Sequence, residues 1–198
     1  MKQVMRFLWI GEWYSAALCA FLVLMGGVFS PIIATYFAGL SAYNSLRSDC
    51  ISGWEMKMLI MPVCRKKSVV ARYLRGIAMA LMIGLLYFLR FQLLYMGQLD
   101  GYAFLLCGVA LAITAISLPI GYADAPPSPN SWRNTMVNFI AIFVGTLAPL
   151  RNGVSDNWVL LEREPLQMEM GLIWLAIGAV AIAVSLPVSL RLEAQREW

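Results

Sequence analysis

The sequence predicts an all-α membrane protein that crosses the bilayer six times. Hydrophobic residues make up 61% of its 198 residues and charged residues only 13%, whereas soluble domains carry about 45–50% apolar and about 25% charged residues. The mean hydropathy is +0.72. One soluble core of this size cannot bury so much apolar surface. The composition therefore excludes a soluble enzyme, a disordered segment and a nucleic-acid-binding domain, although the net charge is +4.

Six apolar stretches are long enough to be membrane spans, since a bilayer core about 30 Å thick requires roughly 20 apolar helical residues. The predicted spans cover residues 9–29, 31–46, 73–95, 102–122, 134–150 and 168–190. The first two are short for two full crossings, so a tilted span followed by a re-entrant segment is an alternative there. Gly26-Gly27 and Ser30-Pro31 predict a tight turn between them.

The N-terminal residues 2–12 alternate charged and large apolar side chains. This pattern is typical of a short helix that lies in the headgroup region. No small-residue cleavage site precedes a hydrophilic segment, so a signal peptide is not expected.

The basic residues indicate the orientation. With six spans, one side of the membrane collects the N-terminus, the 47–72 and 123–133 loops and the C-terminal tail. That side holds 12 of the 15 Lys and Arg residues, and the other three are Arg90, Arg151 and Arg163. Because Lys and Arg concentrate on the cytoplasmic side, we expect both termini to be cytoplasmic. This bias explains the basic net charge without an acidic ligand.

Few charges or helix-breaking residues lie within the spans. Arg90 is expected to reach the outer headgroups and Glu12 to lie at the inner interface. Pro119 and Pro187 are each expected to kink or end their helix. Small residues four apart on the third span predict close helix packing within one subunit. They are Gly76, Ala80 and Gly84.

No catalytic, cofactor or metal site is predicted. The chain contains no histidine, and histidine is the commonest metal ligand and general base at neutral pH. The four cysteines are far apart and form no CxxC pair, so neither a disulfide framework nor a zinc site is expected. The acidic residues between 156 and 169 are separated by Arg163 and Pro165, which is typical of a solvated loop.

The loop at 47–72 carries the most information. Ser52 and Glu55 have the spacing of a capping box, which starts a helix. Pro62 ends that helix, because the residue before a proline is disfavoured in the helical conformation. The sequence therefore predicts a helix of about two turns from Gly53 to about Ile60.

This short helix is apolar nearly all round. Trp54, Met58 and Met61 mark one side at positions i, i+4 and i+7, and further apolar residues cover another. An exposed apolar surface of this kind marks a site that binds a protein or a membrane. Methionine side chains are flexible, so a methionine-rich face can adapt its packing to the groove that it contacts. The residues alone are equally compatible with two environments for this helix. One is a lipid interface with the basic run 65–67 on anionic headgroups, and the other is a partner protein.

The motif around this helix favours a partner protein over lipid. Asp49-x-x-Ser-Gly-Trp-Glu55, then Met-Pro-Val-Cys-Arg-Lys-Lys over 61–67 and Val-Val-Ala-Arg-Tyr-Leu over 69–74, resembles the signature of six-span permeases of the type-2 ABC superfamily, which are related to bacterial peptide and antibiotic exporters. Cys50 stands where the family has a second acid, which is expected to weaken one polar contact with the partner. Met61 replaces a usual Leu and Cys64 a usual Ser or Thr. Ser185, Ser189 and the 191–196 tail resemble the family's last span more loosely.

The resemblance implies a permease subunit that exports an amphipathic or peptide-like substrate from the bacterial cytoplasm. A separate ATPase subunit would bind ATP and receive the short coupling helix, because the chain has no phosphate-binding Gly-x-x-x-x-Gly-Lys motif. The implied ATPase contacts are Ser52, Trp54, Glu55, Met58, Met61, Pro62, Arg65 and Lys66. A second permease subunit, identical or similar, would complete the pathway. A non-transporting immunity or sensor protein with the same fold is the alternative.

Overall fold

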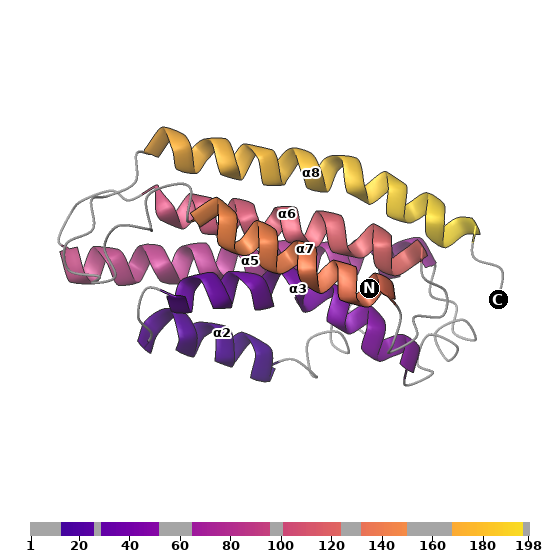
Figure 1. Ribbon diagram of the computed structural model, residues 1–198, viewed down its shortest axis with the longest axis horizontal. Helices are drawn as coiled ribbons and strands as arrows, with labels where there is room; N and C mark the ends of the chain where they lie inside the picture. The colour runs from indigo at the N-terminus through magenta and orange to yellow at the C-terminus, as the bar shows by residue number, and fades with distance from the viewer. Residues whose placement is uncertain are drawn as a thin grey trace.

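The computed structural model describes residues 13–25, 29–51, 65–95, 101–123, 132–149 and 168–195. Every regular element in these ranges is an α-helix, and they contain no strand. The helices are α2 (Trp13–Met25), α3 (Phe29–Ile51), α5 (Arg65–Tyr95), α6 (Tyr102–Ala123), α7 (Trp132–Pro149) and α8 (Met168–Gln195). They lie side by side along the long axis of the molecule (Figure 1). The predicted all-α class is confirmed.

Three of these helices are long and apolar enough to cross a membrane. They are Lys66–Arg90 within α5, Tyr102–Ala123 and Met168–Gln195. Each described helix coincides with one predicted span, but three helices extend several residues further than predicted. Helix α8 continues to Gln195, past residue 190. Helix α3 continues to Ile51, past residue 46, and α5 begins at Arg65, ahead of residue 73. Both ends of the predicted 47–72 loop are therefore helical, and three of their charged residues, Arg47, Asp49 and Arg72, have polar partners in the bundle.

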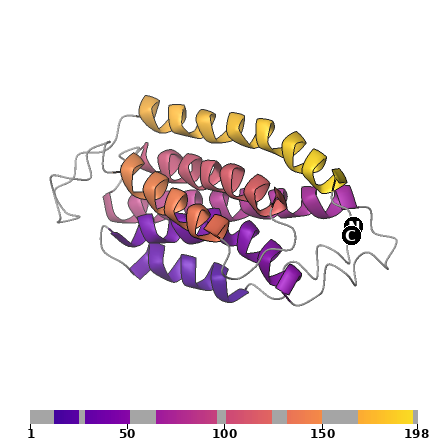
Figure 2. The same ribbon diagram turned by 45° about the vertical axis from the view of Figure 1, so that its right-hand side comes forward.

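Helix α6 is the centre of the bundle. It packs against α3, α5, α7 and α8, and most of its side chains are buried. Helix α8 lies along one outer edge and α2 along the opposite edge in both ribbon views (Figures 1 and 2). Because α6 is apolar all round, a position inside the bundle is the one that its sequence favours.

Helices α6 and α8 run in the same direction and approach each other closely. The buried residues of α8 form a narrow stripe of Gly171, Gly178, Ser185, Ser189 and Glu193. A Cβ atom added at Gly171 would collide with the carbonyl of Gly101, and one at Gly178 with that of Gly108. Because both partners repeat every seven residues, the two backbones stay in contact over several turns.

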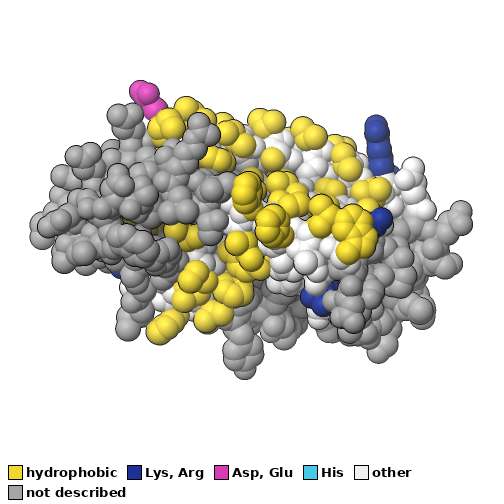
Figure 3. Space-filling model, viewed as in Figure 1, with side chains coloured by type: hydrophobic (Ala, Val, Ile, Leu, Met, Phe, Trp, Pro, Cys, Tyr) yellow, Lys and Arg dark blue, Asp and Glu magenta, His cyan; other side chains and the backbone are white. Residues whose placement is uncertain are grey.

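The remaining faces are apolar and open. The outward face of α8 exposes Ile173, Val180 and Val184, and that of α7 exposes Phe139 and Phe143, whose rings stack 6.3 Å apart. Apolar side chains extend across the face shown in Figure 3. A surface of this kind is expected where lipid replaces water.

Neither proline within a helix ends it. Helix α6 continues past Pro119 to Ala123, and α8 continues past Pro187 to Gln195. Proline removes the backbone bond to the carbonyl four residues earlier. At Pro119 that carbonyl belongs to Ala115, and the Ser185 hydroxyl of α8 donates to it at 2.6 Å. A contact between two helices thus replaces the lost bond.

Candidate functional site

The candidate site is a set of buried polar side chains at the end of the bundle where α3 ends and α5 begins. Arg72 lies near the start of α5, and its Nη2 atom is 2.9 Å from Oδ2 of Asp49 in the last turn of α3. The Arg72 side chain is 2% exposed and that of Asp49 19%. Nη1 of Arg72 donates to the Tyr122 hydroxyl of α6 at 3.0 Å. One guanidinium therefore joins three helices.

A second arginine continues this connection towards the middle of the bundle. Nη1 of Arg75 donates to the Ser45 hydroxyl at 2.9 Å, and both residues are buried. Residues 45 and 49 of α3 therefore pair with 75 and 72 of α5, as expected for antiparallel helices. Charged groups within apolar surroundings are costly unless they are paired. These contacts join α3 and α5, the helices before and after residues 52–64, into an antiparallel pair. We call this pair the braced hairpin.

Next to Arg72, Tyr73 connects α5 with α8. Its hydroxyl forms hydrogen bonds with the hydroxyls of Ser185 and, at 2.8 Å, Ser189. The Ser185 hydroxyl also bonds to the Ala115 carbonyl of α6. Arg72 and Tyr73 together therefore bind the base of α5 to α3, α6 and α8.

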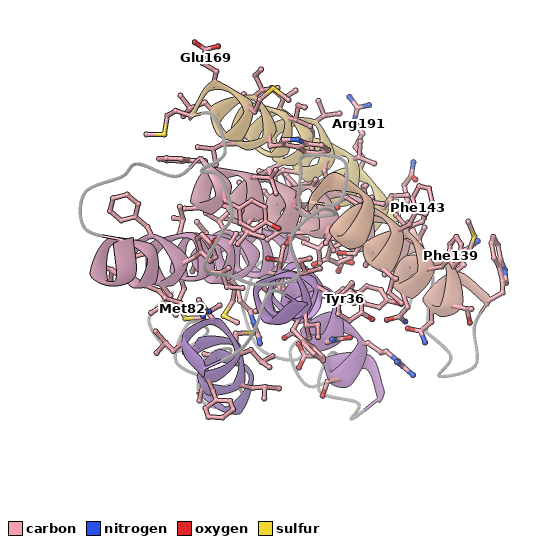
Figure 4. All side chains as sticks on the ribbon, turned by 60° about the vertical axis from the view of Figure 1, so that its left-hand side comes forward. Tyr36, Met82, Phe139, Phe143, Glu169 and Arg191 are labelled. Carbon is pink, nitrogen blue, oxygen red and sulfur yellow. The ribbon has the colours of Figure 1, made fainter. Side chains whose placement is uncertain are left out.

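A third polar group joins α3 to α7. Oδ1 of Asn134 accepts hydrogen bonds from the Tyr43 hydroxyl at 3.2 Å and from Nη1 of Arg47 at 3.3 Å. One turn further along α7, Oδ1 of Asn138 accepts a bond from the Tyr36 hydroxyl at 2.9 Å. Figure 4 shows Tyr36 on α3 among the helices of the bundle. Polar side chains therefore connect α3 with α7 at two points.

The small residues on α5 lie against α6. A Cβ atom at Gly76 would be 2.5 Å from Cγ2 of Thr114, and one at Gly84 would be 3.2 Å from Cβ of Cys107. Ala80, between them, is fully buried. Residues 76 and 84 therefore lie on the face of α5 that meets α6.

The comparison with known families gives a match over nearly the whole chain. Residues 5–193 match the family described as ABC-2 family transporter protein. The chain belongs to that family. It is therefore the membrane-embedded permease of an ABC-type transporter, and the resemblance seen in the 49–74 motif is confirmed. No curated protein and no solved structure matches it significantly.

Most of the predicted ATPase contacts of this ABC-2 permease lie outside the described residues. They are Ser52, Trp54, Glu55, Met58, Met61 and Pro62. Arg65 is the first residue of α5, and Lys66 is exposed beside it. The predicted coupling helix at 53–60 thus falls in the segment that the braced hairpin flanks, and the role of its residues stays a prediction.

Two charged residues outside the predicted ATPase contacts have partners within the permease. Nη1 of Arg90, the residue expected to reach the outer headgroups, donates to the Val23 carbonyl at 2.6 Å, and this contact is partly buried. Val23 is in the last turn of α2, where helical carbonyls lack partners and a positive charge is favourable. Asp49, the acid that the motif retains, forms an ion pair with Arg72 within the permease.

Sequence reasoning missed the buried network. Arg72 and Arg75 were counted only as cytoplasmic charges, although their spacing places them on one helical face next to apolar residues 69–71. That spacing is the signal that could have identified them as buried. Nothing in the sequence indicated Tyr73 as the partner of Ser185, because the contact joins residues 112 apart.

In the part of the chain that the structure describes, no group of three or more metal-ligating side chains gathers. Cys19 and Cys107 are buried and free. The polar side chains of the permease instead connect helices, and family membership indicates a transporter subunit rather than an enzyme.

Proposed function

We propose that this ABC-2 permease exports an amphipathic or peptide-like substrate when a separate ATPase subunit acts on the 52–64 segment. The observation that carries the proposal is the partly buried Asp49–Arg72 ion pair between the two helices that flank this segment. A force applied to the segment would move α3 and α5 together instead of spreading them. Rigid movement of packed helices is a common form of switching.

In this proposal, the predicted helix at Gly53–Ile60 binds in a groove of the ATPase. Trp54 and Met58 are the proposed apolar anchors, because buried aromatic residues contribute most to interface energies. Arg65 and Lys66 would be charges at the rim, which guide association more than they hold it. The exposed position of Lys66 is compatible with this role.

The proposed topology is a single permease domain, residues 1–198, with six spans in a bacterial plasma membrane and both termini in the cytoplasm. The distribution of charge supports this orientation. Lys66, Lys67 and Arg191 are exposed at the end where α5 begins and α8 finishes, whereas Glu169 lies at the start of α8. Figure 4 labels Glu169 and Arg191 near opposite ends of α8. The basic end is the one expected to face the cytoplasm.

The complete transporter would contain two permease subunits and ATP-binding subunits. The permease would need no cofactor of its own, because ATP would be bound by the partner. The open apolar faces of α7 and α8 leave room for a second permease, either identical or related, as well as for lipid.

Co-purification from native membranes tests this function. We expect the tagged chain to bring down an ATP-hydrolysing subunit, and Trp54→Ala to lose most of that subunit while still inserting into the membrane. Trp158→Ala is the matched control, because residue 158 is predicted to lie on the opposite side. If the wild-type chain captures no ATPase, or Trp54→Ala retains it fully, the proposal fails. A complex that hydrolyses ATP but moves no peptide would favour the sensor alternative.

A further inference from the structure

The hydroxyls around Tyr73 form a hydrogen-bond chain with only one possible direction. The Ala115 carbonyl can only accept, so the single proton of Ser185 is used on it. Ser185 must then accept the Tyr73 proton, and Tyr73 in turn accepts from Ser189. The chain therefore runs from Ser189 through Tyr73 and Ser185 to Ala115, and it passes from α8 to α5, back to α8 and on to α6.

Pro119 makes the end of this chain available. In an uninterrupted helix the N–H of residue 119 would bond to the Ala115 carbonyl, and proline has no N–H. The carbonyl thus lacks its usual backbone donor and accepts from Ser185 of α8 instead. Each bond in such a chain polarises the next, so loss of one member weakens the others.

The chain begins on the residue after Arg72. Successive residues on a helix point about 100° apart, so Arg72 contacts α3 and α6 while Tyr73 contacts α8. The N-terminal part of α5 is therefore bound to α3 and α6 through Arg72 and to α8 through Tyr73. The glycine contacts between α6 and α8 bring the backbones together but include no side-chain hydrogen bond. The Tyr73 chain is thus a specific connection between the braced hairpin and α8.

We propose that the Ser189–Tyr73–Ser185–Ala115 hydrogen-bond chain transmits movement of α5 to α8 during the ATP cycle, with Tyr73 as a positioning residue. This inference rests on the proposed function, in which the ATPase moves the 52–64 segment. It predicts that loss of one hydroxyl leaves the movement of α5 intact and uncouples α8.

Distance measurements between spin labels test the inference in the permease–ATPase complex. Labels are placed on the exposed residues Lys67 of α5, Arg191 of α8 and Trp132 of α7, after replacement of the four native cysteines by alanine. The complex is held in nanodiscs of phosphatidylethanolamine and phosphatidylglycerol, with and without ATP and vanadate. The 67–132 pair reports α5, and the 191–132 pair reports α8.

Both pairs should change distance on addition of ATP and vanadate in the wild-type chain. In Tyr73→Phe, the 67–132 change should persist, while the population with a shifted 191–132 distance should fall about fivefold, the usual effect of one buried hydrogen bond. Ser185→Ala should behave alike and serves if Tyr73→Phe does not fold. Ser117→Ala is the matched control, because among the described residues that buried hydroxyl bonds to the Thr114 carbonyl of its own helix and to no other helix.

The possible failures are distinguishable. If the wild-type 191–132 distance shifts and Tyr73→Phe and Ser185→Ala shift equally, the inference is overturned and the proposed function stands. The same holds if Ser117→Ala loses the α8 shift as much as they do. If neither pair moves in the wild-type complex, the ATPase does not drive α5, and both the inference and the proposed function are wrong.

Discussion

Replacement of Asp49 by asparagine tests whether the ion pair at the base of the bundle supports the fold. Asp49→Asn keeps the shape of the side chain but removes its charge, so Arg72 retains a buried positive charge. The Tyr122 hydroxyl still accepts one bond from Nη1 of Arg72. The expected result is a less stable hairpin of α3 and α5.

The structure sets the size of this effect. Breaking a buried pair by removing one partner costs about 3–5 kcal/mol. Asp49 is 19% exposed and Tyr122 remains as a partner, so we expect the lower end, about 3 kcal/mol. That loss changes the unfolding equilibrium constant by about a hundredfold.

Reversible unfolding in mixed detergent micelles, followed by tryptophan fluorescence, measures the effect. The cycle also includes Arg72→Met and the double variant. Because neither charge is left alone in the double variant, it should be more stable than the sum of the single losses by at least about 1 kcal/mol. Lys66→Met is the control, since Lys66 is exposed on the same helix and should cost less than about 0.5 kcal/mol.

A loss below about 0.5 kcal/mol for Asp49→Asn would refute the reasoning, because so small a cost is typical of exposed positions. Strict additivity in the double variant would refute it as well. Either result would mean that the two charges do not interact strongly in the membrane-embedded chain.

Three further substitutions test the helix contacts. Gly178→Leu should force α8 away from the Gly108 carbonyl and lower the melting temperature in detergent, whereas Ile177→Leu, at an exposed position, should not. Arg90→Met should cost about 1 kcal/mol through loss of the bond to the carbonyl at the end of α2, measured by unfolding in micelles; an unchanged midpoint would contradict the contact. Asn134→Leu removes the Asn134 acceptor of the Tyr43 and Arg47 bonds and should cost about 1–3 kcal/mol in the same assay, whereas Met136→Leu, on the exposed face of α7, should be neutral.

The helices could be predicted from the sequence because their signals are local. Each apolar stretch gave a helix, and the separation of Gly76, Ala80 and Gly84 by four residues follows directly from the period of a helix. The boundaries of α3, α5 and α8 were set too short, because an apolar stretch in the sequence ends at the first charged residues. A helix continues through Arg72 and Asp49 when these residues are paired.

The polar network could not be predicted because it depends on tertiary contacts. Tyr73 meets Ser185 only after α5, α6 and α8 have packed. Pro119 was interpreted from its local effect on α6. Pro119 also leaves the Ala115 carbonyl available to α8. That consequence can be seen only when the position of Ser185 is known. The sequence alone also placed Arg90 by its distance from the start of a span and gave no indication of Val23.

Photo-crosslinking from the 52–64 segment tests the central claim most directly. A photo-crosslinking amino acid replaces Met58 in cells, and the membranes are irradiated and the products identified by mass spectrometry. The account predicts a covalent product between this permease and an ATP-binding subunit, which is lost when Trp54→Ala is added. Products with lipid alone, or labelling of position 58 by a reagent that reaches only the outer face, would contradict it.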